Sequence, residues 1–331
     1  MTTKAADCSG VCSKKLNPFI HFCMKKFTWK KLIVAAAAGF AAAMVAFPAV
    51  TEAGAKSAIS IWLNSVVPVL LPFFIFADFL KRTVDMERIP VKVYPMAMAF
   101  MSGYPMGAKI VGDLVREGIL SPEKGRHVLS YSLVTGPAFI LGTVGIFLGN
   151  SQAAAIAAIS HYAGALVNGC LWRCDGRVEF CRLHGSLERR EANYMDHFTE
   201  SILVSFRSMA IILAYLVVFM IGADLLETLK ILDFLPDETW RSFAKGLMEM
   251  TMGTSAVGMC NISLGLKTVL TAFLISFGGL SVIGQSLSVS GGWISAGALV
   301  EIKLTHGLLA GIIASVFILA GNIVYTGQFM V

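Results

Sequence analysis

Two short segments interrupt apolar runs of this chain with residues that helices tolerate poorly, and a binding site is expected at these interruptions. The first is Thr135-Gly136-Pro137, and the second runs from Ser276 to Ser281 and contains Gly278 and Gly279. Proline removes a backbone donor and clashes with the preceding turn. A broken helix exposes an N-terminus whose free N–H groups and positive dipole end attract anions. We therefore predict a site for a small carboxylate or a polar heterocycle; the alternative is that these glycines only allow close helix packing.

Two other apolar stretches, near residues 93–115 and 243–265, carry small polar residues and glycines at their centres. Their hydroxyls and amides, together with Gln285 after the second break, would complete the site. The predicted substrate-binding residues are Ser102, Gly103, Tyr104, Lys109, Thr135, Gly136, Pro137, Glu249, Thr254, Ser255, Ser276, Gly278, Gly279, Ser281 and Gln285.

Two ionisable residues of this set lie inside apolar segments, where a charge costs about 2.5–3.5 kcal/mol at the bilayer centre on insertion scales. Lys109 is a candidate partner for a substrate carboxylate, and the alternative is that it extends to the cytoplasmic surface. Glu249 is a candidate carrier of a coupling proton or partner of a basic residue, unless it lies near the outer surface. Glu301, Lys303 and His306 are interpreted as an interfacial cluster at the start of the last helix.

No residue pattern indicates an enzyme. The six histidines have neither the spacing of metal ligands nor a spacing that pairs them with a candidate nucleophile, and no phosphate-binding loop is present. We expect no catalytic residues, no bound metal and no cofactor. The net charge of +6 is spread between apolar blocks, so no nucleic-acid partner is expected.

The composition indicates a polytopic membrane protein that is all-α. Of the 331 residues, 56% are hydrophobic and only 15% are charged, whereas soluble domains carry about 25% charged residues. A helix needs about 20 mostly apolar residues to cross a bilayer. Seven segments meet that requirement: 32–50, 58–80, 127–149, 152–172, 202–226, 268–289 and 298–325.

The stretches at 93–115 and 243–265 are interpreted as re-entrant hairpins, because irregular backbone at membrane depth must be buried in protein or line a water-filled cavity. Two ordinary glycine-containing helices are the alternative. The lysine-rich start followed by the apolar run 32–50 resembles a signal peptide, but its polar and apolar parts are both long for one, which favours a retained anchor helix.

The distribution of lysine and arginine predicts the orientation. With a cytoplasmic N-terminus, nineteen of these residues lie inside and five outside, provided that both hairpins return to the side from which they enter. The two halves then have the same element order and opposite membrane sense, as in the inverted repeats of secondary transporters. The predicted parts are an N-terminus with anchor helix (1–56), a first repeat (57–172), a cytoplasmic linker (173–200) and a second repeat (201–331).

The combined motifs resemble those of the YlbJ-type sporulation integral membrane proteins, which carry a nucleoside-recognition "gate" domain and are distant relatives of concentrative nucleoside transporters. The resemblance covers roughly residues 57–325. It is carried by SGYPMGAK at 102–109, TGPAFILGTVG at 135–145, GLMEMT at 246–251 and SFGGLS at 276–281.

The resemblance implies a multi-pass protein of the mother-cell-derived outer forespore membrane that exports dipicolinate, a planar aromatic dicarboxylate, toward the forespore. A nucleoside or heterocycle transporter and a non-transporting scaffold for sporulation proteins are the alternatives. The expected partners are a small organic anion and the lipid bilayer, and a homo-oligomer is compatible with the sequence. The sodium-site residues of nucleoside transporters cannot be matched one by one to this chain.

Overall fold

The computed structural model of the protein describes residues 29–83, 90, 92–173 and 193–320, and every regular element within these ranges is a helix. The all-helical prediction is therefore confirmed for this part of the chain. Two compact units divide the molecule at Pro48. The first unit contains α2 (Trp29–Ala46) and ends at Pro48, which is the first residue of α3 (Pro48–Ile61).

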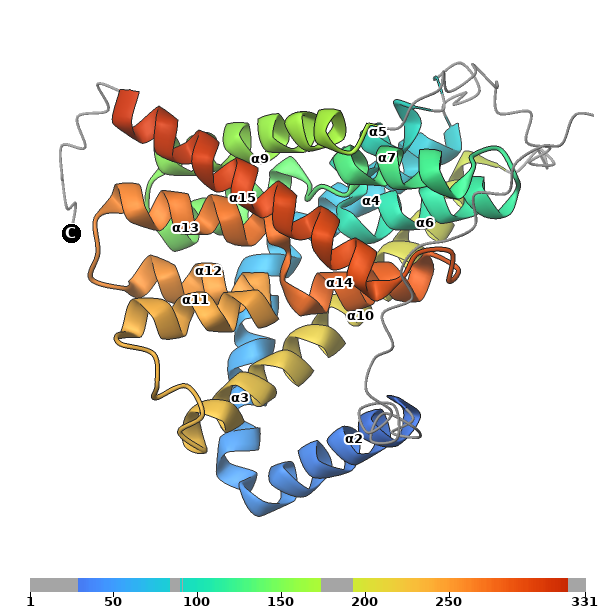
Figure 1. Cartoon of the computed structure of the whole chain (residues 1–331). Helices are drawn as coiled ribbons and strands as arrows, with labels where there is room; N and C mark the ends of the chain where they lie inside the picture. Colours follow the sequence, from blue (N-terminus) through green and yellow to red (C-terminus); the bar gives the residue numbers. More distant parts are fainter. Residues whose placement is uncertain (1–28, 84–89, 91, 174–192, 321–331) are drawn as a thin grey trace, which may run out of the picture. The chain divides into compact units, whose positions relative to one another are not determined.

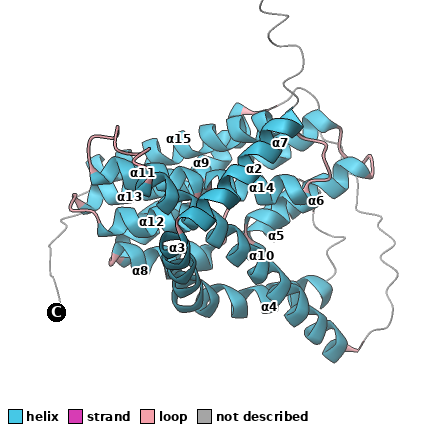
Figure 2. Ribbon diagram, turned by 90° about the horizontal axis from the view of Figure 1, so that it is seen from below, coloured by secondary structure: helices cyan, strands magenta, loops and turns pink. Residues whose placement is uncertain are grey.

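The second unit holds all the remaining helices (Figures 1 and 2). A π-helical turn at Trp62–Val66 joins α3 to α4, and another at Phe139–Val144 precedes α8. The helices after α3 are α4 (Val67–Thr83), α5 (Tyr94–Ser102), α6 (Tyr104–Arg116), α7 (Pro122–Ser132), α8 (Gly145–Leu148), α9 (Ser151–Leu171), α10 (Tyr194–Thr228), α11 (Glu238–Met248), α12 (Met250–Met259), α13 (Leu264–Phe277), α14 (Gly279–Val289) and α15 (Ala296–Ala320).

Four helical segments are long and apolar enough to cross a membrane: 151–171, 194–228, 264–289 and 296–320. A bent pair, 34–46 with 48–66, makes a fifth candidate if it counts as one span. The predicted number of seven spans is thus not confirmed. The predicted span 127–149 is divided at the break that the sequence predicts, because four residues without helix separate α7 from the helix that begins at Pro137. The predicted N-terminal segment 1–28 and most of the linker 173–200 lie outside the described residues.

Both interrupted stretches fold as helical hairpins. In the first, α5 and α6 pack on each other around Gly103, and in the second, α11 and α12 pack around Glu249. The legs of the second hairpin approach closely because small residues face each other. A methyl group on Gly253 would lie 2.0 Å from the Gly246 Cα. The hairpin legs at 94–116 and 238–259 correspond to the two stretches that the sequence singles out.

The surface of α15 is that of a helix that contacts lipid. Leu304, Leu308 and Ile312 follow one another at four-residue spacing and are 43%, 51% and 60% exposed. On the opposite side of the same helix, Lys303 and His306 are buried against α9 and α13, beside which α15 runs (Figure 1). Apolar side chains outside and ionisable ones inside reverse the pattern of a soluble protein and fit an integral membrane protein.

Candidate functional site

The first broken helix is unwound over residues 133–136, and the helix resumes at Pro137. Proline suits the first position of a helix because an N–H at that position has no partner within the helix, so its absence costs nothing. The φ of proline is also already helical. The second break is at Gly278 and Gly279, whose φ values of +84° and +75° lie in the left-handed region that favours glycine. Both predicted breaks are therefore present.

Each hairpin tip lies against the break of the helix that follows it in the chain. A methyl group on Gly136 would lie 3.3 Å from the Phe100 carbonyl oxygen, at the tip of the first hairpin. A methyl group on Gly279 would lie 3.0 Å from the Met248 carbonyl oxygen and 3.1 Å from the Glu249 nitrogen, at the tip of the second. The glycines are needed at these points because two backbones approach within contact distance.

Side chains from α9 and α15 satisfy the backbone groups that the first break leaves free. Asn168 donates to the Ser130 carbonyl at 2.9 Å, and Tyr162 donates to the Thr135 carbonyl at 2.9 Å. Lys303 Nζ donates to the Leu133 carbonyl at 3.1 Å. Unsatisfied backbone groups away from water cost several kcal/mol each, so these side chains make the unwound segment tolerable inside the protein.

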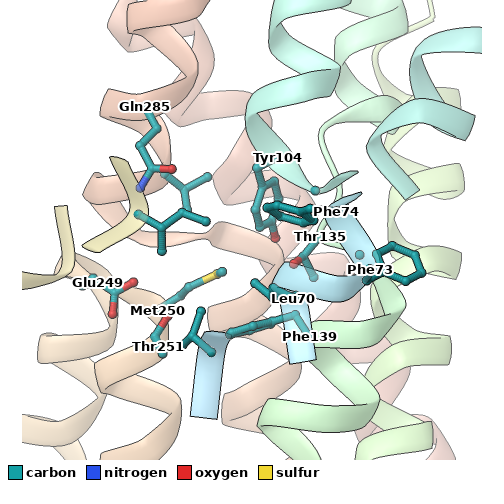
Figure 3. Close-up of a pocket in the computed structure, with 15 residues that line it drawn as sticks. Leu70, Phe73, Phe74, Tyr104, Thr135, Phe139, Glu249, Met250, Thr251 and Gln285 are labelled. Carbon is teal, nitrogen blue, oxygen red and sulfur yellow. The ribbon is translucent and has the colours of Figure 1, made fainter. Parts of the chain in front are cut away.

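The tips of both hairpins and the first break line one pocket (Figure 3). Its empty volume is about 620 Å³, including its opening. Glu249, Met250 and Thr251 lie on one side of it, and Tyr104, Thr135 and Phe139 lie on the other. The remaining wall is largely apolar and is formed by Val66, Leu70, Phe73, Phe74, Gly103, Gly136, Ile212, Val282 and Gln285.

Three helix N-termini begin at this pocket: those of α6, of the helix that starts at Pro137, and of α12. Glu249 caps the third, because its carboxylate accepts a hydrogen bond from the Met252 N–H at 2.7 Å. The Glu249 side chain is 5% exposed, and within the described ranges no lysine or arginine pairs with it. The pocket thus combines a buried acid with backbone donors and aromatic rings.

The predicted site residues fall into three groups. The first lines the pocket and consists of Gly103, Tyr104, Thr135, Gly136, Glu249 and Gln285.

The second group belongs to the breaks without lining the pocket. Pro137 starts the helix after the first break, and Gly278 and Gly279 form the second. Ser276, one turn of chain before Gly279, is fully buried, and its hydroxyl contacts His161 at 2.8 Å.

The third group lies elsewhere. The Lys109 side chain is exposed on α6, and the Thr254 hydroxyl bonds back to the Met250 carbonyl at 2.8 Å. Ser255 lines a second, more open pocket with Asp224. Ser281 is buried, and its hydroxyl has no hydrogen-bond partner among the described residues. Ser102 is the last residue of α5, and its side chain is outside the described set.

The interpretation of Lys303 and His306 as interfacial is wrong. These side chains are 0% and 1% exposed, and only Glu301 of the three is at the surface. Sequence reasoning also missed His161, which contacts both breaks. The available signal was the presence of ionisable side chains within apolar helices, which in membrane proteins usually face the protein interior.

Fold and site together define an all-helical integral membrane protein whose pocket lies where two helical hairpins meet a broken helix. The chain is similar to the sporulation integral membrane protein YlbJ of Bacillus subtilis (strain 168), with 24% identity over an alignment that covers 84% of this chain and 79% of YlbJ. This similarity confirms the resemblance to YlbJ-type proteins. No family model matches the chain, and no solved structure matches it.

Proposed function

We propose that the protein is a secondary transporter of a small organic anion, with dipicolinate as the leading substrate, exported from the mother cell toward the forespore. The observation that carries this proposal is the convergence of both hairpin tips and the first break on one pocket. Secondary transporters bind their substrates near the middle of the bilayer between discontinuous helices. Unwound backbone that is held by buried polar side chains beside a pocket is what such a site requires.

The chemistry of the pocket suits a planar aromatic acid. The rings of Phe74, Tyr104 and Phe139 offer faces for stacking, and three helix N-termini offer N–H groups to carboxylates. Glu249 has the same sign of charge as a dicarboxylate. In this proposal Glu249 therefore carries the coupling proton, which removes the repulsion while the substrate is bound.

A nucleoside or another heterocycle is the second candidate, and a specific pair of residues favours it. Glu249 and Gln285 both line the pocket, and together they offer hydrogen-bond acceptors and amide donors to the edge of a neutral base. The aromatic residues would then stack on the base. The two candidates differ in charge. Neutralising Glu249 should therefore change the affinity for a dicarboxylate and the affinity for a neutral heterocycle in opposite directions.

Transport assays in vesicles separate these candidates. The purified protein is reconstituted, and uptake and equilibrium binding of labelled dipicolinate, uridine and adenosine are measured. Isophthalate, which has both carboxylates but no ring nitrogen, serves as the matched ligand for dipicolinate. Preference for dipicolinate supports the main proposal, and preference for nucleosides supports the second. Absence of binding by any of these ligands to folded protein would overturn both.

A scaffold for other sporulation proteins is the alternative outside transport. It predicts that substituting pocket residues such as Gly136 leaves sporulation intact, whereas replacing the linker 173–200 abolishes it. The transport proposal predicts the reverse. Sporulation and dipicolinate content, measured in cells that carry each variant, decide between the two.

The proposed orientation places the N-terminus in the cytoplasm and makes the two hairpins open to opposite sides of the membrane. The charge distribution and the matching contacts of each hairpin tip with the next break support it. Single cysteines at Glu117 and Asn261, both exposed next to a hairpin leg, provide the test. Labelling of the two sites from opposite sides is expected, and labelling from one side would refute the inverted repeat.

A further inference from the structure

One imidazole bridges the two broken helices. His161 lies on α9 and is fully buried. The Thr135 backbone N–H, in the first break, donates to its Nε2 at 3.1 Å. Its Nδ1 lies 2.8 Å from the hydroxyl oxygen of Ser276, at the end of α13. The helix that carries His161 is therefore the common support of both breaks.

The directions of these bonds determine the chemical state of the ring. A backbone N–H can only donate, so Nε2 must accept and cannot carry a hydrogen. The proton of the neutral ring is then on Nδ1, which donates to the Ser276 hydroxyl. A doubly protonated imidazole would point an N–H at the Thr135 N–H and lose this bond.

Other titratable side chains face the ring from three helices. His306 on α15 has its ring centre 4.8 Å from that of His161, and its Nε2 donates to the His161 carbonyl at 2.9 Å. Lys303 on α15 holds the Leu133 carbonyl of the same break. The ring centre of Tyr104 on α6 lies 6.3 Å from that of His161, and the ring centre of Tyr162 on α9 lies 5.0 Å from it. Both pairs of rings meet edge-on. The imidazole is thus enclosed on all sides within the described structure.

We infer that His161 is the positioning residue of the pocket: its neutral, Nδ1-protonated ring ties the break that carries Thr135 and Gly136 to Ser276 in the second broken helix. Thr135 and Gly136 line the pocket, so the ring sets where this wall lies relative to α13. Any movement that separates the two breaks must break at least one of these two hydrogen bonds. The inference rests on the proposed function only in taking the pocket as the solute site.

Two conservative variants separate the two bonds. In His161→Gln the amide oxygen can reach the position of Nε2 and keep the Thr135 bond. In His161→Asn the amide nitrogen can reach the position of Nδ1 and keep the Ser276 bond. His161→Phe keeps the ring volume and loses both.

The test is a double-mutant cycle with Ser276→Ala. Ser286→Ala is the control, because the Ser286 hydroxyl is also buried but has no hydrogen-bond partner in the part of the chain that the structure describes. Each single bond should be worth about threefold to tenfold in dipicolinate affinity. Ser276→Ala should therefore weaken binding by that factor in the wild-type and His161→Asn proteins and have no further effect in His161→Gln. Equal losses in the Gln and Asn backgrounds would overturn the inference.

A spectroscopic measurement decides the same question without any variant of His161. In protein with ¹⁵N-labelled histidine, one side chain should show a protonated Nδ1 and an unprotonated Nε2, with an Nδ1 resonance that shifts in Ser276→Ala and not in Ser286→Ala. Absence of that tautomer would refute the inference. If the wild-type protein binds neither dipicolinate nor nucleosides, the proposed function fails. The role of His161 is then still decided by the tautomer and by the same double-mutant cycle with the unfolding temperature as the measured quantity.

Discussion

The Nζ atom of Lys303 lies 4.3 Å from the centre of the Tyr104 ring. The same nitrogen donates to the Leu133 carbonyl at 3.1 Å, and the Tyr104 hydroxyl donates to the Ile275 carbonyl. Tyr104 also lines the pocket. One lysine and one tyrosine therefore connect the first break, the end of α13 and the pocket wall, although they are far apart in the sequence.

Replacing Lys303 by methionine should lower stability by about 1–3 kcal/mol, because the Leu133 carbonyl loses its donor in a buried place. Lys303→Ala should cost about 2 kcal/mol more, since it also leaves a cavity. Thermal unfolding of the purified variants measures both effects. Equal stability of the methionine variant and the wild type would show that the Leu133 carbonyl does not depend on Lys303.

Replacing Gly253 by alanine should force the legs of the second hairpin apart, because the added methyl group would lie 2.0 Å from the Gly246 Cα. We expect a loss of about 3 kcal/mol in stability. Gly297→Ala is the matched control, since Gly297 is also helical and, within the described ranges, no atom lies within 4 Å of an added methyl group. Similar unfolding temperatures for the two variants would contradict the close packing of α11 on α12.

Replacing Glu249 by glutamine removes the charge that faces the pocket and keeps the size of the side chain. If Glu249 carries the coupling proton, the variant should bind dipicolinate with an affinity that no longer changes with pH, and transport driven by a proton gradient should be lost. Binding isotherms at several pH values and uptake with and without a gradient test this prediction. Retention of gradient-driven uptake would assign the proton to another group.

Replacing Lys109 by alanine should change the affinity for dipicolinate by no more than about twofold, as is usual for an exposed position. The sequence alone favours a larger loss for a dicarboxylate than for a neutral ligand, because Lys109 could pair with a carboxylate. The structure places its side chain at the surface of α6 and outside the pocket lining. A loss of tenfold or more, confined to the charged ligand, would show that Lys109 reaches the solute after all.

The breaks and hairpins could be predicted because their causes are local. Pro137 cannot donate a backbone hydrogen bond, and Gly278 and Gly279 adopt φ values that other residues avoid. The extent of the first break was not predictable in the same way. Its unwound residues 133–136 end at Pro137, and they stay unwound because Tyr162 and Lys303 satisfy their carbonyl groups.

The number of spans could not be predicted from the apolar content of the sequence alone, because composition does not specify how long a helix continues. The segment 127–149 is apolar enough in sequence to count as one span, but at its predicted break the helix stops after Ser132 and resumes only at Pro137. The role of Lys303 was misread for a related reason. Glu301 and Thr305, its polar neighbours on α15, do not by themselves indicate which side of the helix faces the protein.

The residues by themselves determined that the chain is helical, that it enters a membrane, and where its helices break, since each of these depends on composition or on the backbone chemistry of proline and glycine. Only the tertiary structure decided that both hairpin tips reach one pocket, that His161 joins the two breaks, and that the Lys109 side chain lies at the surface outside the pocket lining. These relationships join residues on separate helices. They depend on which helix faces pack together, and that packing reflects the whole set of contacts rather than any single segment.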